Sequence, residues 1–293
     1  MPIARPHITQ KERLRSYAAI FSSSSFAHLL RTCDFDFINS KIARYDQNKL
    51  GTKFTTYSEY IRYVYNQLKR DYRCEYIYKN EIINELLLKK YGTLNTVVIN
   101  EFKVGRSVAD MVLFNGTSKA FEIKTELDSE RRLSGQLNDY TRIFRECYIV
   151  THESLIEKYQ STDENIGLIA IMKHGRTFHM EEVRKATINS SIDADILIRS
   201  IRTQEYKNIV ISYFGELPKT TNFQMYNACL EQMKNIPTDA LQHLFITELK
   251  KRASNTQSLN TYVKELRQLC LSMKITPKQY LQLDNILSQT IKI

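Results

Sequence analysis

Residues 107–125 read SVADMVLFNGTSKAFEIKT, which is two apolar runs separated by Asn115-Gly116. Asn-Gly between two apolar runs is a strong signal for a β-hairpin, so we expect neighbouring strands on either side of it. Strands that are almost continuously apolar are usually covered on both faces. Because a carboxylate in such a strand costs free energy unless it is paired or binds a metal, the charged residues here indicate a site. These residues are Asp110, Glu122 and Lys124.

The length of the turn decides whether Asp110 can join the other two. Side chains alternate along a strand, so Glu122 and Lys124 share a face. A three-residue loop of residues 115–117 would place Asp110 opposite Glu122, whereas a two-residue Asn-Gly loop would place it on the far face. A catalytic site therefore predicts an odd-length loop with Gly116 in a left-handed conformation, or a β-bulge that restores the phase.

The tripeptide Glu-x-Lys carries little information by itself. It also occurs as Glu101-Phe102-Lys103 and as Glu248-Leu249-Lys250, where a solvated strand or helix face is the ordinary explanation. Only the copy at residues 122–124 lies in a pair of nearly continuous apolar strands. The context, and not the tripeptide, therefore supports a site.

Length and composition indicate a globular protein of two or three compact units. The chain has 293 residues, of which 42% are hydrophobic and 25% are charged. No apolar run reaches the roughly 18 residues of a membrane span, and the amino terminus lacks the layout of a signal peptide. We therefore expect a cytoplasmic protein.

Cysteine and histidine usage indicates no disulfide framework and no zinc knuckle. The five cysteines are odd in number, widely spaced and without a C-x-x-C pair, which indicates reduced core residues and neither a disulfide framework nor a zinc knuckle. The six histidines are scattered. His174 and His179 flank an expected hairpin at Gly175-Arg176, where we predict a surface or packing role.

The net charge of +10 is unevenly distributed. Residues 1–78 carry 13 Lys and Arg against 7 Asp and Glu, residues 79–183 carry 14 against 16, and residues 184–293 carry 15 against 9. An acidic centre between basic segments fits an enzyme that acts on a polyanion, because cations neutralise phosphates while carboxylates hold a metal. A generally basic protein with an acidic core is the alternative.

Three regions are expected along the chain. Residues 1–71 look helical, with Thr-x-x-Glu capping boxes that begin at Thr9 and at Thr56, and with loops at 22–25 and 46–53. Arg and Tyr alternate between residues 60 and 73, on a face that contacts either nucleic acid or solvent. Residues 186–293 look helical again, with helices over 238–253 and 258–273 and a last one opened by Thr276-Pro277. This tail would bind nucleic acid, dimerise or regulate access.

Residues 72–185 have the pattern of a compact α/β module. A helix over 79–91 ends at Gly92, which is a natural carboxyl-terminal cap. Three strands are expected after it, near 95–103, 107–114 and 119–125. A helix over 129–145 and a strand at 147–151 follow, with further strands near 166–172 and 177–183.

The order of these features resembles the PD-(D/E)XK nuclease superfamily of restriction and repair enzymes. The matching residues follow one another as a helix with Glu81, a strand, Asp110, Glu122-Ile123-Lys124, and a helix with Gln136-Leu137 and Tyr140. Residues 72–151 are similar to the core of a bacterial family of nuclease-like proteins without settled function. The resemblance covers about residues 72–155 and implies a restriction-endonuclease-like α/β/α core, namely helix, three strands, helix, strand. The proline that often precedes the first acid is replaced here by Ala109.

The resemblance also implies a chemistry for each matching position. Asp110, Glu122, the main-chain carbonyl of Ile123 and Glu81 would hold Mg²⁺ or Mn²⁺, which prefer hard oxygen ligands. Lys124 would orient or help deprotonate the attacking water and stabilise the transition state. Gln136 would position water or backbone.

The acid on the helix is the least determined of these positions. Glu81 and Glu85 lie one turn apart and share a face, but Glu85 has Lys89 four residues on as a ready partner, which favours Glu81. Glu101 on the first strand is a further candidate, and Glu126 is a weaker one. Each of these acids is also explained as ordinary surface charge.

Two functions from different classes follow. The first is a Mg²⁺-dependent endonuclease, a hydrolase of phosphodiester bonds. The resemblance favours DNA over RNA as its substrate and places it in bacterial anti-phage defence or a mobile element. The second is a non-catalytic regulator that binds nucleic acid or protein and retains the nuclease fold as a scaffold. The resemblance also allows a homodimer, a regulatory protein partner, or a nuclease held inactive by its own helical regions.

Overall fold

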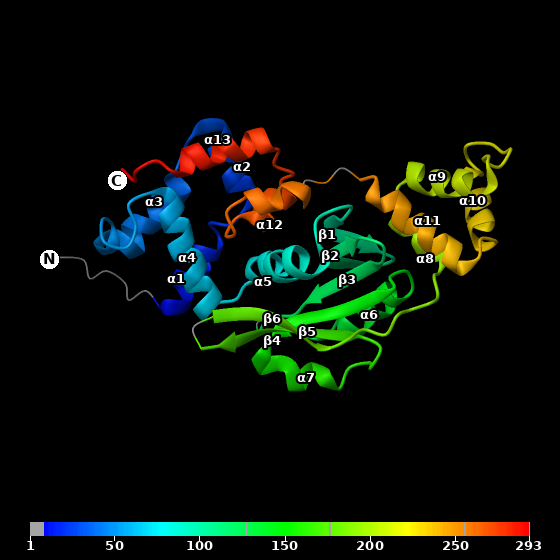
Figure 1. Cartoon of the computed structure of the whole chain (residues 1–293), viewed down its shortest axis with the longest axis horizontal. Coiled ribbons are helices and arrows are strands. Elements are labelled where there is room, and N and C mark those ends of the chain that lie inside the picture. The colour runs from blue at the N-terminus through cyan, green and yellow to red at the C-terminus, as the bar shows by residue number, and fades with distance from the viewer. Residues whose placement is uncertain (1–8, 127, 176, 253, 255, 293) are drawn as a thin grey trace. The chain divides into compact units, whose positions relative to one another are not determined.

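The computed structural model describes residues 9–126, 128–175, 177–252, 254 and 256–292. The chain forms two compact units, which Figure 1 shows coloured by residue number. Unit 1 consists of Met1–Asn84 together with Ser258–Ile293, and unit 2 consists of Glu85–Gln257. Among the described residues, no helix is both long enough and apolar enough to span a membrane.

The described part of unit 1 is built mainly from helices. Two of them begin with the expected capping boxes, since the side chains of Thr9 and Thr56 accept hydrogen bonds from the backbone N–H groups of Glu12 and Glu59. The helical elements are α1 (Gln10–Ala18), α2 (Ser23–Thr32), α3 (Asp36–Lys41), η1 (Ile42–Asp46), η2 (Gln47–Lys49), α4 (Tyr57–Asp71), α5 (Glu75–Glu81), α12 (Arg267–Ser272) and α13 (Pro277–Leu287).

The expectation of a loop at residues 22–25 is wrong. Ser22 is the N-cap of α2, and its hydroxyl accepts a hydrogen bond from the backbone N–H of Ser25 at 3.1 Å. Serine is common both in loops and at helix N-caps, and only the second role applies here. A helix therefore begins where the serine run suggested a loop.

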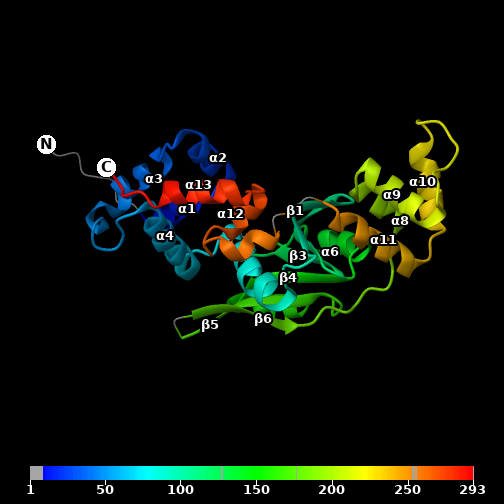
Figure 2. The ribbon, with the colours of Figure 1, turned by 45° about the horizontal axis from the view of Figure 1, so that its top comes forward.

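The last helices of the chain pack against the first ones. Helix α13 contacts α2 and α4, and α12 contacts α5. Figure 2 shows the orange and red carboxyl-terminal helices among the blue amino-terminal ones. The backbone joins them too, because the Ile291 N–H donates to the Thr55 carbonyl at 2.9 Å. The region 186–293, expected as one helical region, is thus shared between the two units, since helical periodicity does not specify which partner a helix packs against.

Two other carboxyl-terminal expectations have different outcomes. Helix α13 begins at Pro277 with Thr276 as its N-cap, as predicted. Residues 258–273 do not form one continuous helix, however. They cover the last part of the 3₁₀-helix η5 (Thr256–Thr261) and, after a break, α12.

Unit 2 contains a six-stranded mixed sheet in the sequential order β1 to β6. Strands β1, β2 and β3 are antiparallel neighbours, β3, β4 and β5 are parallel neighbours, and β6 is antiparallel to β5. The strands are β1 (Val97–Val104), β2 (Ser107–Phe114), β3 (Ser118–Ile123), β4 (Glu146–His152), β5 (Gly167–His174) and β6 (Thr177–Arg184). An α/β fold with three strands, a helix and a fourth strand in this order is therefore confirmed.

Helices flank this sheet. Helix α6 (Leu133–Thr141) contacts β2 and β4, α8 (Ala194–Ser200) contacts β1, and α11 (Thr238–Lys250) contacts β2. Helix α9 (Thr203–Phe214) packs on α11 and on α10 (Met225–Lys234), and α10 packs on α8, as Figure 1 shows in yellow. The short elements η4 (Glu153–Leu155) and α7 (Ile156–Gln160) pack against β5. The aromatic core that joins the sheet to these helices includes Phe102, Phe114, Phe144 and Phe245.

The helix expected over residues 79–91 exists in a different form. After α5, the chain continues as a wide π-helix, η3 (Ile82–Tyr91), in which residue 85 marks the start of unit 2. Gly92 ends it with a φ of +78°, as expected for a glycine cap, and its N–H donates to the Leu87 carbonyl at 2.7 Å. π-helical turns are rare and interrupt ordinary helical spacing.

Candidate functional site

The hairpin between β2 and β3 turns through three residues. Phe114 pairs with Ser118, so residues 115–117 form the loop, and Gly116 has a φ of +119°. The Asn115 N–H donates to the Thr117 carbonyl at 3.2 Å. The predicted odd-length loop with positive φ at Gly116 is confirmed, and the register continues to place Asp110 opposite Glu122.

Asp110 lies where β2 and β3 stop pairing through their backbones. Met111 and Phe121 form the last backbone pair, and beyond it Oδ2 of Asp110 accepts a hydrogen bond from the Ile123 N–H at 2.7 Å. Glu122, Ile123 and Lys124 meanwhile remain attached to β4, since the Lys124 N–H donates to the Val150 carbonyl at 2.9 Å. The Asp110 side chain therefore bridges the point at which the two strands separate.

Lys124 connects strand β3 with helix α6. Its Nζ donates to Oε1 of Glu122 at 2.8 Å and to Oε1 of Gln136 at 3.2 Å. Glu122 is 2% exposed and Lys124 is 7% exposed, so both charges are withdrawn from water. Gln136 and Asp110 are only half-buried, which leaves that side of the group more accessible. We call Asp110, Glu122, Lys124, Gln136 and Tyr140 the acidic cluster.

Tyr140 completes the acidic cluster from helix α6, one turn after Gln136. Its hydroxyl lies 2.7 Å from Oε2 of Glu122 and 2.8 Å from the Val108 carbonyl. Burial raises the pKa of the Tyr140 hydroxyl well above its ordinary value, and the negative charge of Glu122 raises this pKa further. The hydroxyl is therefore a proton donor, and the two oxygens of Glu122 are held from two sides.

A contact that the sequence did not predict fixes α6 over the strands. Oδ2 of Asp139 accepts hydrogen bonds from the Ser107 hydroxyl at 2.7 Å and from the Arg106 N–H at 3.3 Å. These groups belong to the turn between β1 and β2, where Gly105 has a φ of +59°. Asp139 lies between Gln136 and Tyr140 in α6, so this anchor also sets their height above β3. No local sequence pattern predicts this contact, because Asp139 and Ser107 are far apart in the chain.

Glu81 is placed in unit 1 and has partners there. Its carboxylate accepts hydrogen bonds from the Tyr65 hydroxyl at 2.5 Å and from Nζ of Lys69 at 2.8 Å. The side chain is 3% exposed. Within unit 2 the structure thus brings together four of the five predicted side chains, and Glu81 belongs to unit 1 with partners of its own.

The other acidic candidates also have identified positions. Glu85 pairs with Lys89 at 2.7 Å, as expected from their spacing. Glu126 is exposed and lies 3.7 Å from Nδ1 of His152. Glu101 is exposed and has a φ of +54°, which is unusual for a non-glycine residue in a strand. The pairing of Asn100 with Met111 and of Phe102 with Ala109 places Glu101 opposite Asp110 in the register.

Comparisons with known proteins identify the family. The family model described as bacteriophage P4 protein cII matches residues 68–280. The chain belongs to this P4 cII family. The acidic cluster lies inside the region that the P4 cII family model covers.

The sequence identity between this P4 cII family member and the relatives compared with it is low. Protein cII of Enterobacteria phage P4 is 26% identical over 180 residues, which are 59% of this chain and 66% of the phage protein. The match thus spans slightly less than two thirds of that relative. A solved structure, the SPO1766 protein of unknown function from Silicibacter pomeroyi, aligns with a TM-score of 0.32 and 14% identity, over 50% of this chain and 94% of that one.

Proposed function

We propose that the acidic cluster binds a divalent cation, Mg²⁺ or Mn²⁺, and that the protein hydrolyses phosphodiester bonds as an endonuclease of restriction-endonuclease-like fold. The observation that carries this proposal is the position of Asp110 opposite Glu122 at the point where β2 and β3 separate. Two carboxylates there, with Lys124 two residues after Glu122, supply both the negative charges that hold a cation and the positive charge that such a reaction needs.

The donor atoms suit the proposed cation. The carboxylates of Asp110 and Glu122 and the carbonyl of Ile123 are hard oxygen donors, which are the ligands that Mg²⁺ and Mn²⁺ prefer. A bound cation would polarise the phosphate and lower the pKa of a coordinated water. Once the hydrogen bond between Lys124 and Glu122 is broken, the ammonium group of Lys124 would orient the water and stabilise the negative charge of the transition state. Gln136 would position Lys124 through the hydrogen bond to its ammonium group, on the more accessible side of the acidic cluster.

The substrate proposed is a nucleic acid, and DNA in particular. Unit 1 carries 19 Lys and Arg against 10 Asp and Glu, a net charge of +9, whereas unit 2 carries 23 against 22, a net charge of +1. Most of the excess positive charge of the chain therefore belongs to unit 1, although residues 184–257 of the second basic segment lie in unit 2. Such a concentration of positive charge supports binding of a polyanion through its phosphates. The choice of DNA, and a setting in bacterial defence or a mobile element, rest on the resemblance to restriction and repair enzymes.

The test is cleavage of DNA and RNA by the purified full chain with Mg²⁺, with Mn²⁺ and with EDTA. We expect metal-dependent cleavage that Asp110→Asn and Lys124→Ala abolish. The matched control is Lys250→Ala, which removes the same charge from the Glu-x-Lys copy in α11 and should cleave normally. Cleavage that survives both substitutions in the acidic cluster would contradict the proposal.

A second candidate function is a non-catalytic regulator that binds nucleic acid or protein. The family match fits this candidate better than the first, because the family is described by a phage protein and not by a reaction. The mutual hydrogen bonds of Glu122, Lys124 and Tyr140 also fit it, since they make a satisfied network without a cation. This candidate predicts binding that weakens with salt, is unaffected by Asp110→Asn, and is accompanied by no Mg²⁺-dependent thermal shift.

A further inference from the structure

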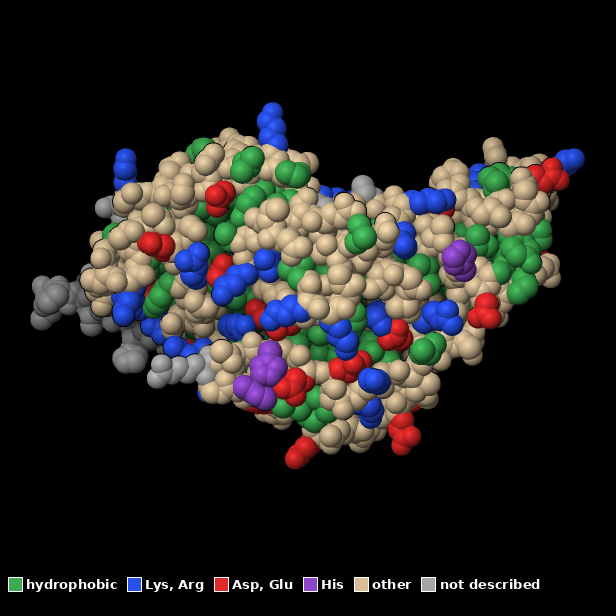
Figure 3. Space-filling model, viewed as in Figure 1, with side chains coloured by type: hydrophobic (Ala, Val, Ile, Leu, Met, Phe, Trp, Pro, Cys, Tyr) green, Lys and Arg blue, Asp and Glu red, His purple; other side chains and the backbone are tan. Residues whose placement is uncertain are grey.

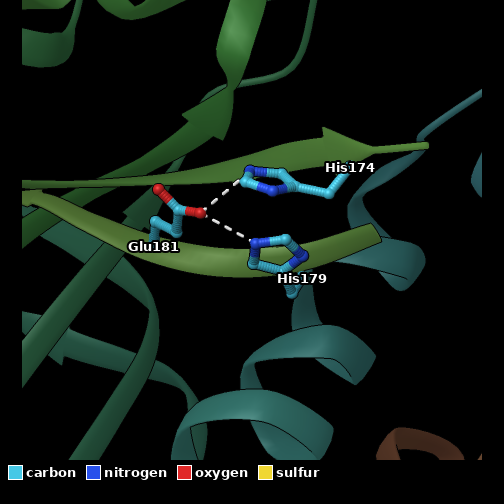
Figure 4. A group of neighbouring side chains, drawn as sticks. All are labelled: His174, His179 and Glu181. Atoms are coloured by element: carbon cyan, nitrogen blue, oxygen red, sulfur yellow. Dashed lines mark hydrogen bonds and ion pairs between the residues drawn. The ribbon is translucent and has the colours of Figure 1, made fainter. Parts of the chain in front are cut away.

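The hairpin of β5 and β6 carries a second group of chemically reactive side chains. His174 is the last residue of β5, while His179 and Glu181 lie two residues apart on β6. Met172 pairs with His179, and His174 pairs with Thr177. Residues two apart on a strand share a face, so all three side chains project from the same face of the hairpin. Figure 4 shows them turned toward one another.

The three side chains meet at a single oxygen atom. Oε1 of Glu181 lies 3.1 Å from Nε2 of His174 and 2.7 Å from Nε2 of His179. The two imidazole rings have centroids 4.1 Å apart. One ligand atom from each residue lies within 4.8 Å of the other two. Two imidazoles and a carboxylate therefore face one small volume.

We propose that His174, His179 and Glu181 bind a first-row transition-metal cation of the Zn²⁺ class. Imidazole nitrogen is a favoured ligand of Zn²⁺, Cu²⁺ and Ni²⁺, whereas Mg²⁺ prefers oxygen alone. With Zn–N and Zn–O bonds of about 2.1 Å, neighbouring ligands of a tetrahedral ion lie about 3.4 Å apart. The separations of 3.1 Å and 2.7 Å from Glu181 are shorter than this, so an outward rotation of the rings, larger for His179, admits the ion.

The backbone of the hairpin holds these residues in register without the ion. The Thr177 hydroxyl donates to the His174 carbonyl at 2.9 Å, and Gly175 has a φ of +60° in the turn. The side chains of His174, His179 and Glu181 are 57%, 32% and 43% exposed, so an ion reaches them directly from solvent. On the face drawn in Figure 3, histidines gather beside acidic side chains. Three protein ligands leave at least one coordination position for water or a further ligand.

This proposal is independent of the proposed nuclease function. The acidic cluster offers only oxygen donors for Mg²⁺ or Mn²⁺, and it shares no residue with the group on the hairpin. Because of this difference in ligands, we expect Zn²⁺ at the hairpin group and Mg²⁺ at the acidic cluster. A failure of cleavage would leave the hairpin site untouched, and a failure of Zn²⁺ binding would leave the acidic cluster untouched.

The test is titration of the EDTA-treated, dialysed full chain with ZnCl₂, followed by calorimetry and by competition with a chromophoric chelator. A Cys33→Ser background removes the exposed thiol as a competing ligand. We expect one Zn²⁺ per chain, with affinity at least tenfold lower in His179→Ala and in Glu181→Gln. Asp110→Asn should bind Zn²⁺ at this site normally, and Co²⁺ bound there should show visible bands without thiolate charge transfer.

The matched control is His28→Ala. His28 pairs with the carboxylate of Asp34 at 3.1 Å, as the hairpin histidines pair with Glu181, but this ion pair contains a single histidine. This variant should bind Zn²⁺ like its parent. Equal Zn²⁺ affinity in the parent, His179→Ala and Glu181→Gln would overturn the proposal, and so would the absence of binding by the parent. Either result would leave the hairpin group as an ion-pair network. Circular dichroism in EDTA verifies that the variants are folded, which their exposed positions favour.

Discussion

Tyr140 of α6 and Glu122 of β3 are joined by a hydrogen bond of 2.7 Å between two fully or almost fully buried side chains. This bond ties the helix to the strand at the centre of the acidic cluster. It occupies one of the two Glu122 oxygens, and Lys124 donates to the other. The cluster is thus stabilised as a unit before any ligand arrives.

Tyr140→Phe should lower the free energy of unfolding by about 1–3 kcal/mol, because it leaves a buried carboxylate oxygen without its donor. The matched control is Tyr159→Phe. The Tyr159 hydroxyl is also buried, and within the described part of the chain it has no hydrogen-bond partner. Its loss should be neutral or slightly stabilising. Urea denaturation measures the free energy of unfolding of both variants. Equal changes would show that the hydrogen bond from Tyr140 to Glu122 contributes nothing to stability.

Lys124→Met should separate cation binding from turnover. The ammonium group of Lys124 competes with a cation for Oε1 of Glu122, so its removal should leave Mn²⁺ binding unchanged or tighter. Cleavage should nevertheless fall at least about 100-fold, because the charge that stabilises the transition state is gone. Asp110→Asn is the contrasting variant and should lose both properties. Calorimetry and a cleavage assay measure them, and loss of Mn²⁺ binding by Lys124→Met would contradict this assignment of roles.

Glu205→Gln should destabilise unit 2 in a pH-dependent way. Glu205 pairs with Arg252 at 2.7 Å and accepts the Arg202 N–H at 2.7 Å. Burial raises the pKa of the Glu205 carboxyl, but these hydrogen bonds outweigh it and hold the pKa below its ordinary value of 4.5. A lowered pKa in the folded state means that the stabilisation is present above pH 4.5 and is lost as the pH falls through the folded pKa.

The expected cost of Glu205→Gln at pH 7 is about 2 kcal/mol, since it weakens charge-assisted hydrogen bonds of the half-buried Arg252. The difference from wild type should shrink as the pH falls below 4.5. Glu216→Gln, at an exposed position of unit 2, is the control and should change little at either pH. Thermal or urea denaturation at pH 7 and pH 3.5 gives the comparison. A constant difference across this range would rule out the ion pair as its cause.

Residues 85–257 should fold as an isolated fragment, because they form one compact unit with its own core. Residues 1–84 alone should not reach their native helical content, since α12 and α13 supply part of the packing surface of unit 1. Adding a peptide of residues 258–293 should increase it. Circular dichroism and thermal melting measure these outcomes. A cooperative melt of residues 1–84 by themselves would contradict the division into units.

The sequence was most informative where the determining interactions are local. The apolar runs, Asn115-Gly116 and the capping residues Thr9, Thr56 and Thr276 act within a few positions, and each structural element they predicted exists. The register position of Asp110 opposite Glu122 followed from the length of the loop. These features need no knowledge of distant contacts.

Features set by long-range packing could not be predicted in the same way. The anchor of Asp139 on the turn before β2 joins residues more than thirty positions apart, and the histidines of the hairpin converge only because β5 and β6 pair in one register. The division of the carboxyl-terminal helices between two units is a further example. Helical periodicity indicates an apolar face, but it does not name the surface that covers that face.

The composition of unit 1 from both ends of the chain has a consequence for synthesis on the ribosome. Domains generally fold as units, with amino-terminal ones first as the chain emerges. Here the helices made first must wait for residues 258–293, while unit 2 is completed in between. Newly made α1 to α5 therefore expose apolar surface throughout translation of the sheet. We expect this interval to be the period in which the nascent protein depends most on chaperones.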